Sequence, residues 1–336
     1  MSVIVVALWG DLHADVVVGA LAARGVRVVR MDLTETDDVP GQIRIASTPL
    51  ASQIRVRREP PLAMGEVSGV LCRIAIDALV PAATVDPLER FAQAEHLAAL
   101  TAALRGIPRE RWINDPWREA YADCRIHQAR VADAMGLRVP PFLVSTEYEE
   151  LCAFASHHGE CVIKPLSDSP LAQVNGCFVA PEDLHTADFV APYAAAFVPL
   201  ADDARCTVDG TPSLIQVRVD KVADVRATVV DDDVYAGIMY REAADPVDIR
   251  LKPHPAVQPL RLPSALADKL VNLVRGLEVR FASCDLVVDA AGDYHFLEAN
   301  VAGNWLWAEP DERMPIAERL AAALVTPVFR SVQSGT

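Results

Sequence analysis

Hydrophobic and polar residues at the start of the chain follow one another in blocks that predict a strand, a helix and a second strand. Residues 3–8 are all apolar, residues 13–23 carry apolar side chains at helical spacing before Gly25, and a mostly apolar run covers 26–31. Two short buried strands joined by a helix are the usual unit of a parallel sheet, and glycine often ends a helix. The chain is therefore expected to open with a parallel α/β layer.

Further elements are predicted on either side of a turn at residues 114–116. After an irregular, proline-containing segment, residues 69–74 predict a short strand and residues 87–105 an alanine-rich helix. The turn then opens one more helix, whose side chains at helical spacing continue up to Gly136. These side chains are Trp117, Tyr121, Cys124, Gln128, Val131 and Met135. We place a domain boundary near this turn.

Beyond the turn the pattern changes to shorter strands with more hairpins. The predicted strands cover 142–144, 160–165, 214–219, 226–230 and 234–238, and helices at 147–157 and 264–275 separate them. This pattern indicates an α+β body attached to the smaller α/β layer.

The segment 282–300 predicts a hairpin that brings two acidic side chains together. Two apolar, β-prone runs flank a turn-rich stretch, and we expect Asp289 to pair with Tyr294 around a four-residue loop. Counting along both strands from that pair places Asp285 opposite Glu298, with their Cβ atoms roughly 4.5–5.5 Å apart. A loop one residue longer would send the two acids to opposite faces of the hairpin.

Asn300 is predicted on the same face as Asp285 and Glu298, because side chains alternate along a strand. Two ionised carboxylates that lie this close repel each other, so a cluster of oxygen ligands favours a bound Mg²⁺ ion. The alternative is a hairpin whose acidic face is simply solvated.

Composition narrows the class of protein. The chain has 336 residues, enough for about two domains, and its net charge of −15 disfavours nucleic acid as a general partner. No apolar run approaches the roughly 20 residues of a membrane span, so we expect a soluble, cytoplasmic protein with no membrane partner. Seven cysteines without a CxxC pair favour reduced, mostly buried thiols over disulfides or a zinc site.

The order of several short motifs resembles that of the ATP-grasp ligases. Within that RimK-like group, the chain looks most similar to the enzymes that mature ribosomal peptides of the microviridin, or graspetide, type. The motifs are residues 112–116 (WINDP), 125–128 (RIHQ), 136–140 (GLRVP), 162–165 (VIKP), 216–226, 296–300 (FLEAN) and 303–309 (GNWLWAE). Residues 10–15 are similar to the opening of the same enzymes, so the resemblance spans almost the whole chain.

The resemblance implies an α/β pre-ATP-grasp domain at 1–113, followed by an α+β ATP-grasp fold with a central lobe at 114–213 and a C-terminal lobe at 214–330. It also implies an ADP-forming ligase that uses ATP and Mg²⁺. The expected partner is a ribosomally made precursor peptide with a leader and a core, with residues 181–212 as the docking region for the leader. Such enzymes phosphorylate Asp or Glu side chains and join them to Ser, Thr or Lys side chains, which closes a macrocycle. Similar enzymes also suggest a homodimer.

The resemblance gives the following residues a role. ATP binding is expected from Arg125, Lys164, Gln216, Val217, Val219 and Lys221; metal binding from Asp285, Glu298 and Asn300; phosphoryl or acyl-phosphate stabilisation from Arg226 and Arg250; and peptide contact from Trp305, Trp307 and Glu309. Arg125 stands where similar enzymes have lysine, and Asn304 stands where they have glutamine. A guanidinium also binds phosphate, so we expect function to survive the first exchange.

Purely structural interpretations stay open for several of these residues. Lys164 ends an apolar strand and could extend into solvent, and Asp224 with Arg226 could form a surface salt-bridge stripe. The tryptophans at 305 and 307 could be core packing. His13, His127 and His295 lack the paired spacing of a metal or nucleophile site, so structural roles are expected.

Two other functions also stay open. A related ligase for free amino acids or a protein terminus would share every ATP residue, and a degenerate ATP-grasp fold could act as a nucleotide sensor.

Overall fold

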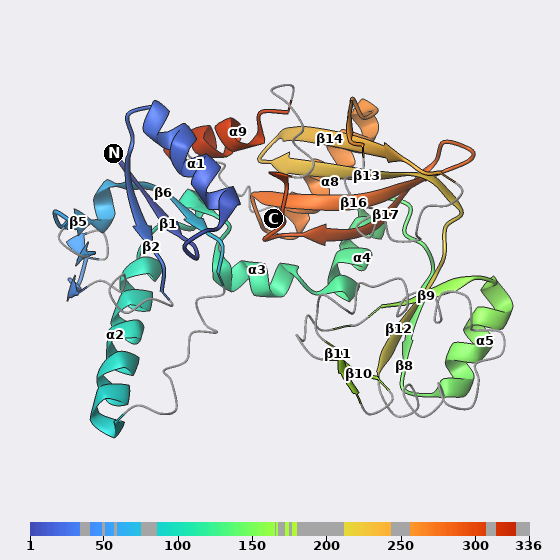
Figure 1. Cartoon of the computed structure of the whole chain (residues 1–336), viewed down its shortest axis with the longest axis horizontal. Helices are drawn as coiled ribbons and strands as arrows, with labels where there is room; N and C mark the ends of the chain where they lie inside the picture. The colour runs from blue at the N-terminus through green and yellow to red at the C-terminus, as the bar shows by residue number, and fades with distance from the viewer. Residues whose placement is uncertain are drawn as a thin grey trace, which may run out of the picture.

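The structure is a computed structural model that describes residues 1–33, 41–48, 51–56, 59–74, 86–164, 166, 172–174, 177–179, 212–242, 256–306 and 314–326. Figure 1 shows an N-terminal α/β layer, a large antiparallel sheet in the C-terminal part, and a smaller antiparallel sheet beside it.

The N-terminal layer is the parallel sheet that the sequence predicts. Its strands follow the order β2-β1-β6-β7, and β1 pairs in parallel with both neighbours. The elements are β1 (Ser2–Val6), α1 (Leu12–Ala23), β2 (Arg27–Met31), β6 (Val67–Cys72), α2 (Pro87–Arg105), η5 (Arg109–Arg111) and β7 (Trp112–Ile113). Part of the segment expected to be irregular forms a three-stranded sheet of β3 (Gln42–Arg44), β4 (Gln53–Arg55) and β5 (Leu62–Ala63), followed by η3 (Met64–Glu66).

Helix α9 (Ile316–Val325) returns to this layer from the far end of the chain. It packs against α1 and β6, as Figure 1 shows for α1 and α9. Gly69 makes the close approach to β6 possible, because a Cβ atom there would overlap the backbone carbonyl of Leu324. Helix α9 is not among the elements predicted from the sequence, although Ile316, Leu320 and Leu324 recur at helical spacing and are buried. The N-terminal core therefore includes residues that lie within the third predicted domain.

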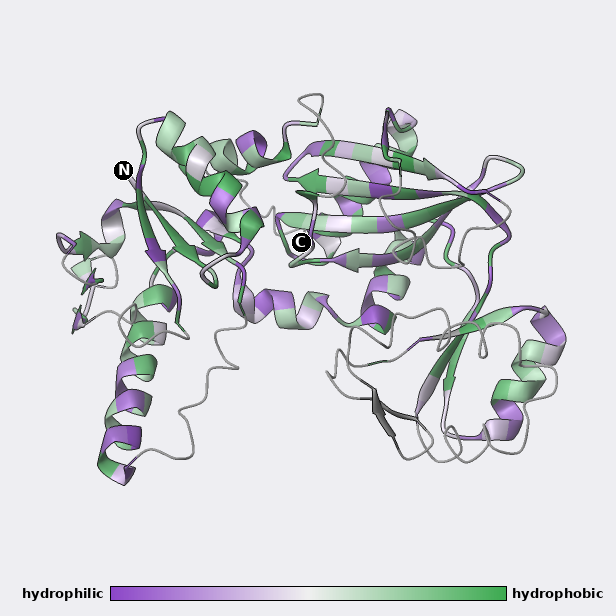
Figure 2. Ribbon diagram, in the orientation of Figure 1, coloured by the Kyte–Doolittle hydropathy of each residue, from purple (hydrophilic) through white to green (hydrophobic). Residues whose placement is uncertain are grey.

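The prediction of a single helix from residue 117 to Gly136 is wrong. The structure has two helices, α3 (Pro116–Ala122) and α4 (Arg125–Ala134), separated at residues 123 and 124. The Gln128 side-chain amide donates to the carbonyl of Ala122 at 2.9 Å, which helps to satisfy the end of α3. Figure 2 shows α3 as largely hydrophilic, which fits a connecting helix between two bodies rather than a core helix.

The smaller antiparallel sheet has the order β8-β12-β9. Its strands are β8 (Phe142–Ser145), β9 (Cys161–Lys164) and β12 (Ser213–Val217), and α5 (Tyr148–His158) packs on it. A separate hairpin joins β10 (Ala172–Val174) and β11 (Cys177–Val179). The predicted strands and helix of this region are present within a few residues of their expected bounds.

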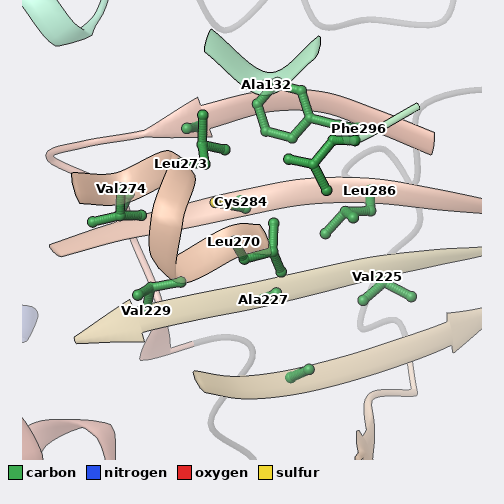
Figure 3. Close-up of a cluster of buried hydrophobic side chains, with 14 of the residues drawn as sticks. Ala132, Val225, Ala227, Val229, Leu270, Leu273, Val274, Cys284, Leu286 and Phe296 are labelled. Atoms are coloured by element: carbon green, nitrogen blue, oxygen red, sulfur yellow. The ribbon is translucent and has the colours of Figure 1, made fainter. Parts of the chain in front are cut away.

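The large sheet has the order β15-β14-β13-β16-β17 and is antiparallel throughout. Its strands are β13 (Lys221–Val230), β14 (Asp233–Tyr240), β15 (Gln258–Leu260), β16 (Phe281–Asp289) and β17 (Tyr294–Asn300), with helix α8 (Ser264–Gly276). Figure 3 shows apolar side chains of one sheet face, among them Val225, Leu286 and Phe296, gathered with Leu270 of α8 and Ala132 of α4. The alternating side chains therefore point to the opposite face, where the polar residues lie.

Five cysteines are described with their thiol environment. Cys72, Cys124, Cys152, Cys161 and Cys284 are free thiols, and three of them are buried. In the described part of the chain, no helix combines the length and the apolar character needed to cross a membrane.

The close contact between β6 and α9 generates a stability prediction. Gly69→Ala should destabilise the protein by about 1–3 kcal/mol, because the added methyl group overlaps backbone that cannot rotate away. Gly19→Ala in α1 is the matched control: nothing lies within 4 Å of its added Cβ, so it should stabilise by up to about 1 kcal/mol. Urea unfolding of both variants measures the difference, and equal effects would contradict the packing described.

Candidate active site

The hairpin of β16 and β17 places Asp285 opposite Glu298, as predicted, but by a different register. The pairing starts with Val288 and Tyr294, so the loop is one residue longer than expected. A β-bulge at Leu297 then inserts one extra residue into β17 and brings the two acids back into a pair. The bulge is what puts both carboxylates on one face.

Each of these two carboxylates is paired with an arginine. Asp285 Oδ1 lies 2.6 Å from Arg226 Nη1, and Glu298 Oε2 lies 3.4 Å from Arg125 Nε. Asn300 donates its Nδ2 to Asp285 Oδ2 at 3.0 Å, which confirms that it shares their face. Two guanidinium groups thus offset the repulsion between the two acids.

The arginine that pairs with Asp285 belongs to the central strand β13. Arg226 is directly opposite Asp285 in the sheet and its side chain is only 7% exposed. Two residues earlier, the buried Asp224 accepts from Lys221 Nζ at 2.6 Å. The surface salt-bridge interpretation is therefore wrong for this strand, because Asp224 and Arg226 are both buried.

Two buried amide side chains hold the backbone of the hairpin. Asn114 donates from Nδ2 to the carbonyls of Phe281 and Val301, each at 2.8 Å, and its Oδ1 accepts from the amides of Arg280 and Phe281. Gln128 makes a reciprocal pair of bonds with Ala299 in β17. These two amides fix the strands that carry the charged side chains of the site.

The donor set on the hairpin fits Mg²⁺. Asp285 and Glu298 supply carboxylate oxygens, which are hard ligands suited to this ion. Asn300, which bonds with Asp285 through Nδ2 in this structure, would add its amide oxygen after a rotation of its side chain. Cys284 points to the opposite face, and burial raises the pKa of its thiol to about 12, so it does not compete as a ligand. Among the described residues no group of three or more His, Cys, Asp or Glu side chains could hold a metal ion; the candidate set consists of two acids and one amide.

Other predicted nucleotide residues lie on the smaller sheet and the segment that leaves it. Lys164 is half-buried at the end of β9, opposite Leu214 of β12. Gln216 is buried in β12, and Val217 donates its amide to the carbonyl of Pro141 at 2.9 Å. Val219 is half-buried between β12 and β13, so this segment connects the two sheets.

Trp305 does not line a peptide cleft in this structure. Its side chain is 1% exposed and packs against Phe281 and His13, with ring centroids 5.5 Å and 4.4 Å apart. The core interpretation is therefore right for this tryptophan, because its ring fills space between the N-terminal layer and β16. Arg250, Trp307, Glu309 and nearly all of 181–212 lie outside the described residues.

The N-terminal layer brings three more residues close to the hairpin, and none of them has a predicted role in the site. Asp11 and His13 follow β1, and Arg73 follows β6, so all three lie at the carboxyl end of adjacent parallel strands. Arg73 Nε lies 2.7 Å from Asp11 Oδ2, and Trp305 donates its amide to His13 Nδ1 at 3.4 Å. The carboxyl edge of a parallel sheet is where ligands bind in open α/β folds, and that rule could have drawn attention to them.

The environment of His13 keeps the ring neutral. Burial and the nearby Arg73 lower the pKa of His13 from 6.5 to about 4, although Asp11 acts in the opposite direction. A neutral ring can accept the Trp305 amide at Nδ1, whereas a protonated one cannot.

The buried amide of Asn114 generates the first site prediction. Asn114→Ala should destabilise the protein by about 3 kcal/mol or more, because it leaves several buried backbone groups without their bonds. Asn272→Ala, on the exposed side of α8, should change stability by at most about 0.5 kcal/mol. Urea unfolding compares the two, and a small effect at Asn114 would contradict its clamping role.

The neutral state of His13 generates a pH prediction. Between pH 6.5 and about 4 the unfolded chain binds a proton that folded His13 does not, so its stabilising contribution is full above pH 6.5 and declines as the pH falls. His13→Gln should remove about 1–2 kcal/mol of this pH dependence, allowing for partial solvent screening.

The measurement is the difference in unfolding free energy between the two proteins from pH 4.5 to 7.5. A difference is needed because Glu119, whose burial raises its pKa to about 8, gives a slope of the opposite sign in both proteins. His157→Gln, at an exposed position, should keep the wild-type slope. A difference that does not change with pH would contradict the neutral ring.

Comparison with known proteins gives similarity in structure alone. No protein-family model matches the chain, and a comparison with curated proteins finds no match. The macrocyclase MdnC of Microcystis aeruginosa, solved with its precursor peptide MdnA, is 23% identical over 97% of this chain and 100% of that one, with a TM-score of 0.70. A RiPP-associated ATP-grasp ligase of Chryseobacterium gregarium, solved with ADP and a leader and core peptide, is 19% identical over 98% and 100%, with a TM-score of 0.78.

A third similar structure is the ATP-grasp ligase PsnB, solved with a minimal precursor, Mg and ADP. It is 21% identical, the match covers 96% of this chain and 97% of that one, and the TM-score is 0.65. All three matches extend over nearly the whole of both chains. This protein therefore has the ATP-grasp fold.

Proposed function

We propose that this protein is an ADP-forming ligase that activates Asp or Glu side chains of a ribosomal precursor peptide and joins them to Ser, Thr or Lys side chains as macrocyclic esters or amides. The observation that carries the proposal is the polar face of the β16–β17 hairpin. There, within an ATP-grasp fold, an oxygen-ligand set lies against two arginines.

The choice of a peptide substrate is supported by the similar structures. MdnC, PsnB and the Chryseobacterium ligase were each solved with a precursor peptide, and the last two also with ADP. Their match to this chain includes the N-terminal layer, which a nucleotide site alone does not require. A protein with such a substrate works where ribosomal peptides are made, in the cytoplasm.

The positions of the cationic residues suit ATP binding between the two sheets. Lys164 would meet phosphate oxygens from the smaller sheet, and Arg125 from the start of α4, beside the hairpin. Val217 at the end of β12 and Val219 just after it would contact adenine through the main chain. Gln216 is buried and supports the strand. Lys221 is held by Asp224, so its part in nucleotide binding is to order the start of β13.

A magnesium ion held by Asp285, Glu298 and Asn300 would neutralise phosphate charge during phosphoryl transfer. The same ion would also replace the arginines as the counter-charge of the two acids, which leaves Arg226 and Arg125 to contact phosphate. These arginines thus have partners both with and without nucleotide.

The chemistry would run in two steps. A peptide carboxylate would attack the γ-phosphorus of ATP, and the bond between that phosphorus and the bridging oxygen of the β-phosphate would break. ADP is then released, and the peptide carries an acyl phosphate. A hydroxyl or amine of the same peptide then attacks the acyl carbon, loses its proton and expels phosphate. Arg226, a cation held in a nearly dry site, would stabilise the charge that develops on the phosphoryl group and on the leaving phosphate.

The test is mass spectrometry of candidate precursor peptides, encoded beside the gene and rich in Thr, Asp and Glu, after incubation with the protein, ATP and Mg²⁺. We expect loss of one water mass for each bond formed. Glu298→Gln should slow the reaction about 10²-fold or more, because it removes charge from the metal set. Glu278→Gln, which alters an exposed acid that is also paired with an arginine, is the matched control and should react at the wild-type rate.

Other outcomes identify the competing functions. ATP turnover with free amino acids, and not with peptides, would overturn the macrocyclase and favour an amino-acid ligase. Tight ATP binding with no turnover for any peptide or amino acid would overturn both and favour a nucleotide sensor.

A further inference from the structure

Arg73 bonds with both the N-terminal layer and the chain that follows the candidate metal hairpin. Its Nε lies 2.7 Å from Asp11 Oδ2, its Nη1 donates to the carbonyl of Ala302 at 3.1 Å, and its Nη2 donates to Asn304 Oδ1 at 3.1 Å. Its guanidinium also lies over the Trp305 ring, 5.3 Å from the centroid. The side chain is only 8% exposed, so these contacts define its position.

Asn304 connects Arg73 with Arg226. The side-chain oxygen of Asn304 accepts from Arg73, and its backbone carbonyl accepts from Arg226 Nη2 at 2.9 Å. Arg226 in turn donates from Nη1 to Asp285 at 2.6 Å. A continuous series of bonds therefore runs from Asp11 of the N-terminal layer to the hairpin.

The order of charges in this series is negative, positive, neutral, positive and negative, which holds both arginines. Two guanidinium groups bound to one residue would repel each other in a site of low exposure. Asp11 compensates Arg73 at one end, and Asp285 compensates Arg226 at the other. Asn304, which is neutral and exposed, can then accept from both.

Gly303 contributes to this geometry. A Cβ atom there would lie 2.7 Å from the carbonyl oxygen of Asn300 and 2.9 Å from the Cβ of Ser283. Only a residue without a side chain lets the chain turn this tightly after β17 and present Asn304 to both arginines.

We propose that Arg73 is a positioning residue, which fixes Asn304 so that the Asn304 carbonyl holds the Arg226 guanidinium at the metal hairpin. The role rests on the proposed function, since Arg226 is the group that would contact phosphate there. Arg73 itself touches neither reacting group. The N-terminal layer thus sets the geometry of a cation in the C-terminal lobe.

Three variants test the proposal: Arg73→Met, Asn304→Ala and the double variant. Asn304→Ala removes the acceptor of Arg73 but keeps the backbone carbonyl that meets Arg226, and the exposed position should tolerate it. If Arg73→Met does not fold, Asn304→Ala carries the test. Arg280→Met is the matched control, because the Arg280 side chain also bridges parts of the chain, through the carboxylate of Asp231 and the carbonyls of Glu110 and Ala323. These three partners lie outside the hairpin, and the substitution leaves the backbone amide of residue 280 in place.

The first readout is steady-state kinetics with peptide and ATP. Arg73→Met should lower kcat about 10²-fold, the scale expected when a catalytic group is displaced by about 1 Å, with the KM for ATP changed less than about twofold. The double variant should be no worse than Arg73→Met, because both changes break the same bond. Additive losses would overturn the link through Asn304.

The second readout does not depend on any reaction of the protein. Modification of Arg226 by phenylglyoxal, followed by peptide mass spectrometry, reports how well its guanidinium is held. We expect faster modification of Arg226 in Arg73→Met and in Asn304→Ala, and the wild-type rate in Arg280→Met. Unchanged modification in the first two variants would overturn the proposal.

The two readouts separate failure of this inference from failure of the proposed function. A wild-type protein that cyclises no peptide, together with faster Arg226 modification in Arg73→Met, would overturn the ligase and support the positioning role. Normal cyclisation with unchanged kcat in Arg73→Met would do the reverse.

Discussion

Two buried carboxamide side chains hold together the parts of this protein that meet at its candidate site. Asn114, at the end of the N-terminal layer, bonds with backbone at the start of β16 and just beyond β17, and Gln128 of α4 bonds with Ala299 near the end of β17. Each amide both donates and accepts, so it replaces strand-like bonds that the hairpin would otherwise lack on that side. The position of the acidic face is therefore fixed through its backbone, while its side chains stay available for chemistry.

The electrostatics of the site follow from this arrangement. Under the proposed function, a protein with a net charge of −15 would have to bind an anionic nucleotide, and the cations that would meet it lie against the protein's own acids. Arg226 and Arg125 each lie against one carboxylate of the hairpin. In each pair the opposite charges stabilise each other. A metal ion that binds the two carboxylates would free the guanidinium groups to contact phosphate. Arg125 reaches Glu298 through a planar guanidinium group that suits this exchange.

The N-terminal layer has more than one connection to the site. Arg73 reaches the chain after β17, His13 packs against Trp305, and α9 closes the layer by returning from the far end of the chain. Each contact joins residues that are hundreds of positions apart, so the layer and the hairpin are parts of one assembly. Peptide chemistry at the hairpin would then depend on residues that bind neither nucleotide nor metal.

The sequence by itself determined the local elements and the identity of the charged residues. The β1-α1-β2 unit, α8 and the hairpin strands could be predicted because their hydrophobic periods are short-range and unambiguous. The pairing of Asp285 with Glu298 was predicted correctly but for an incomplete reason, since a longer loop and a bulge cancel each other. Neither irregularity leaves a signal in the residue pattern.

Only the tertiary structure decided which distant residues share the site and which are buried. Trp305 is of a residue type that is common at binding surfaces, but here it is buried in a core. Arg73 belongs to no motif that was identified in the sequence, yet it contacts the site through Asn304. Periodicity reports which face of an element is apolar, whereas the partner of that face depends on packing between elements far apart in the chain. Likewise, α3 and α4 are separate helices although side chains at helical spacing continue across residues 123 and 124, and Gln128 bonds with both Ala122 and β17.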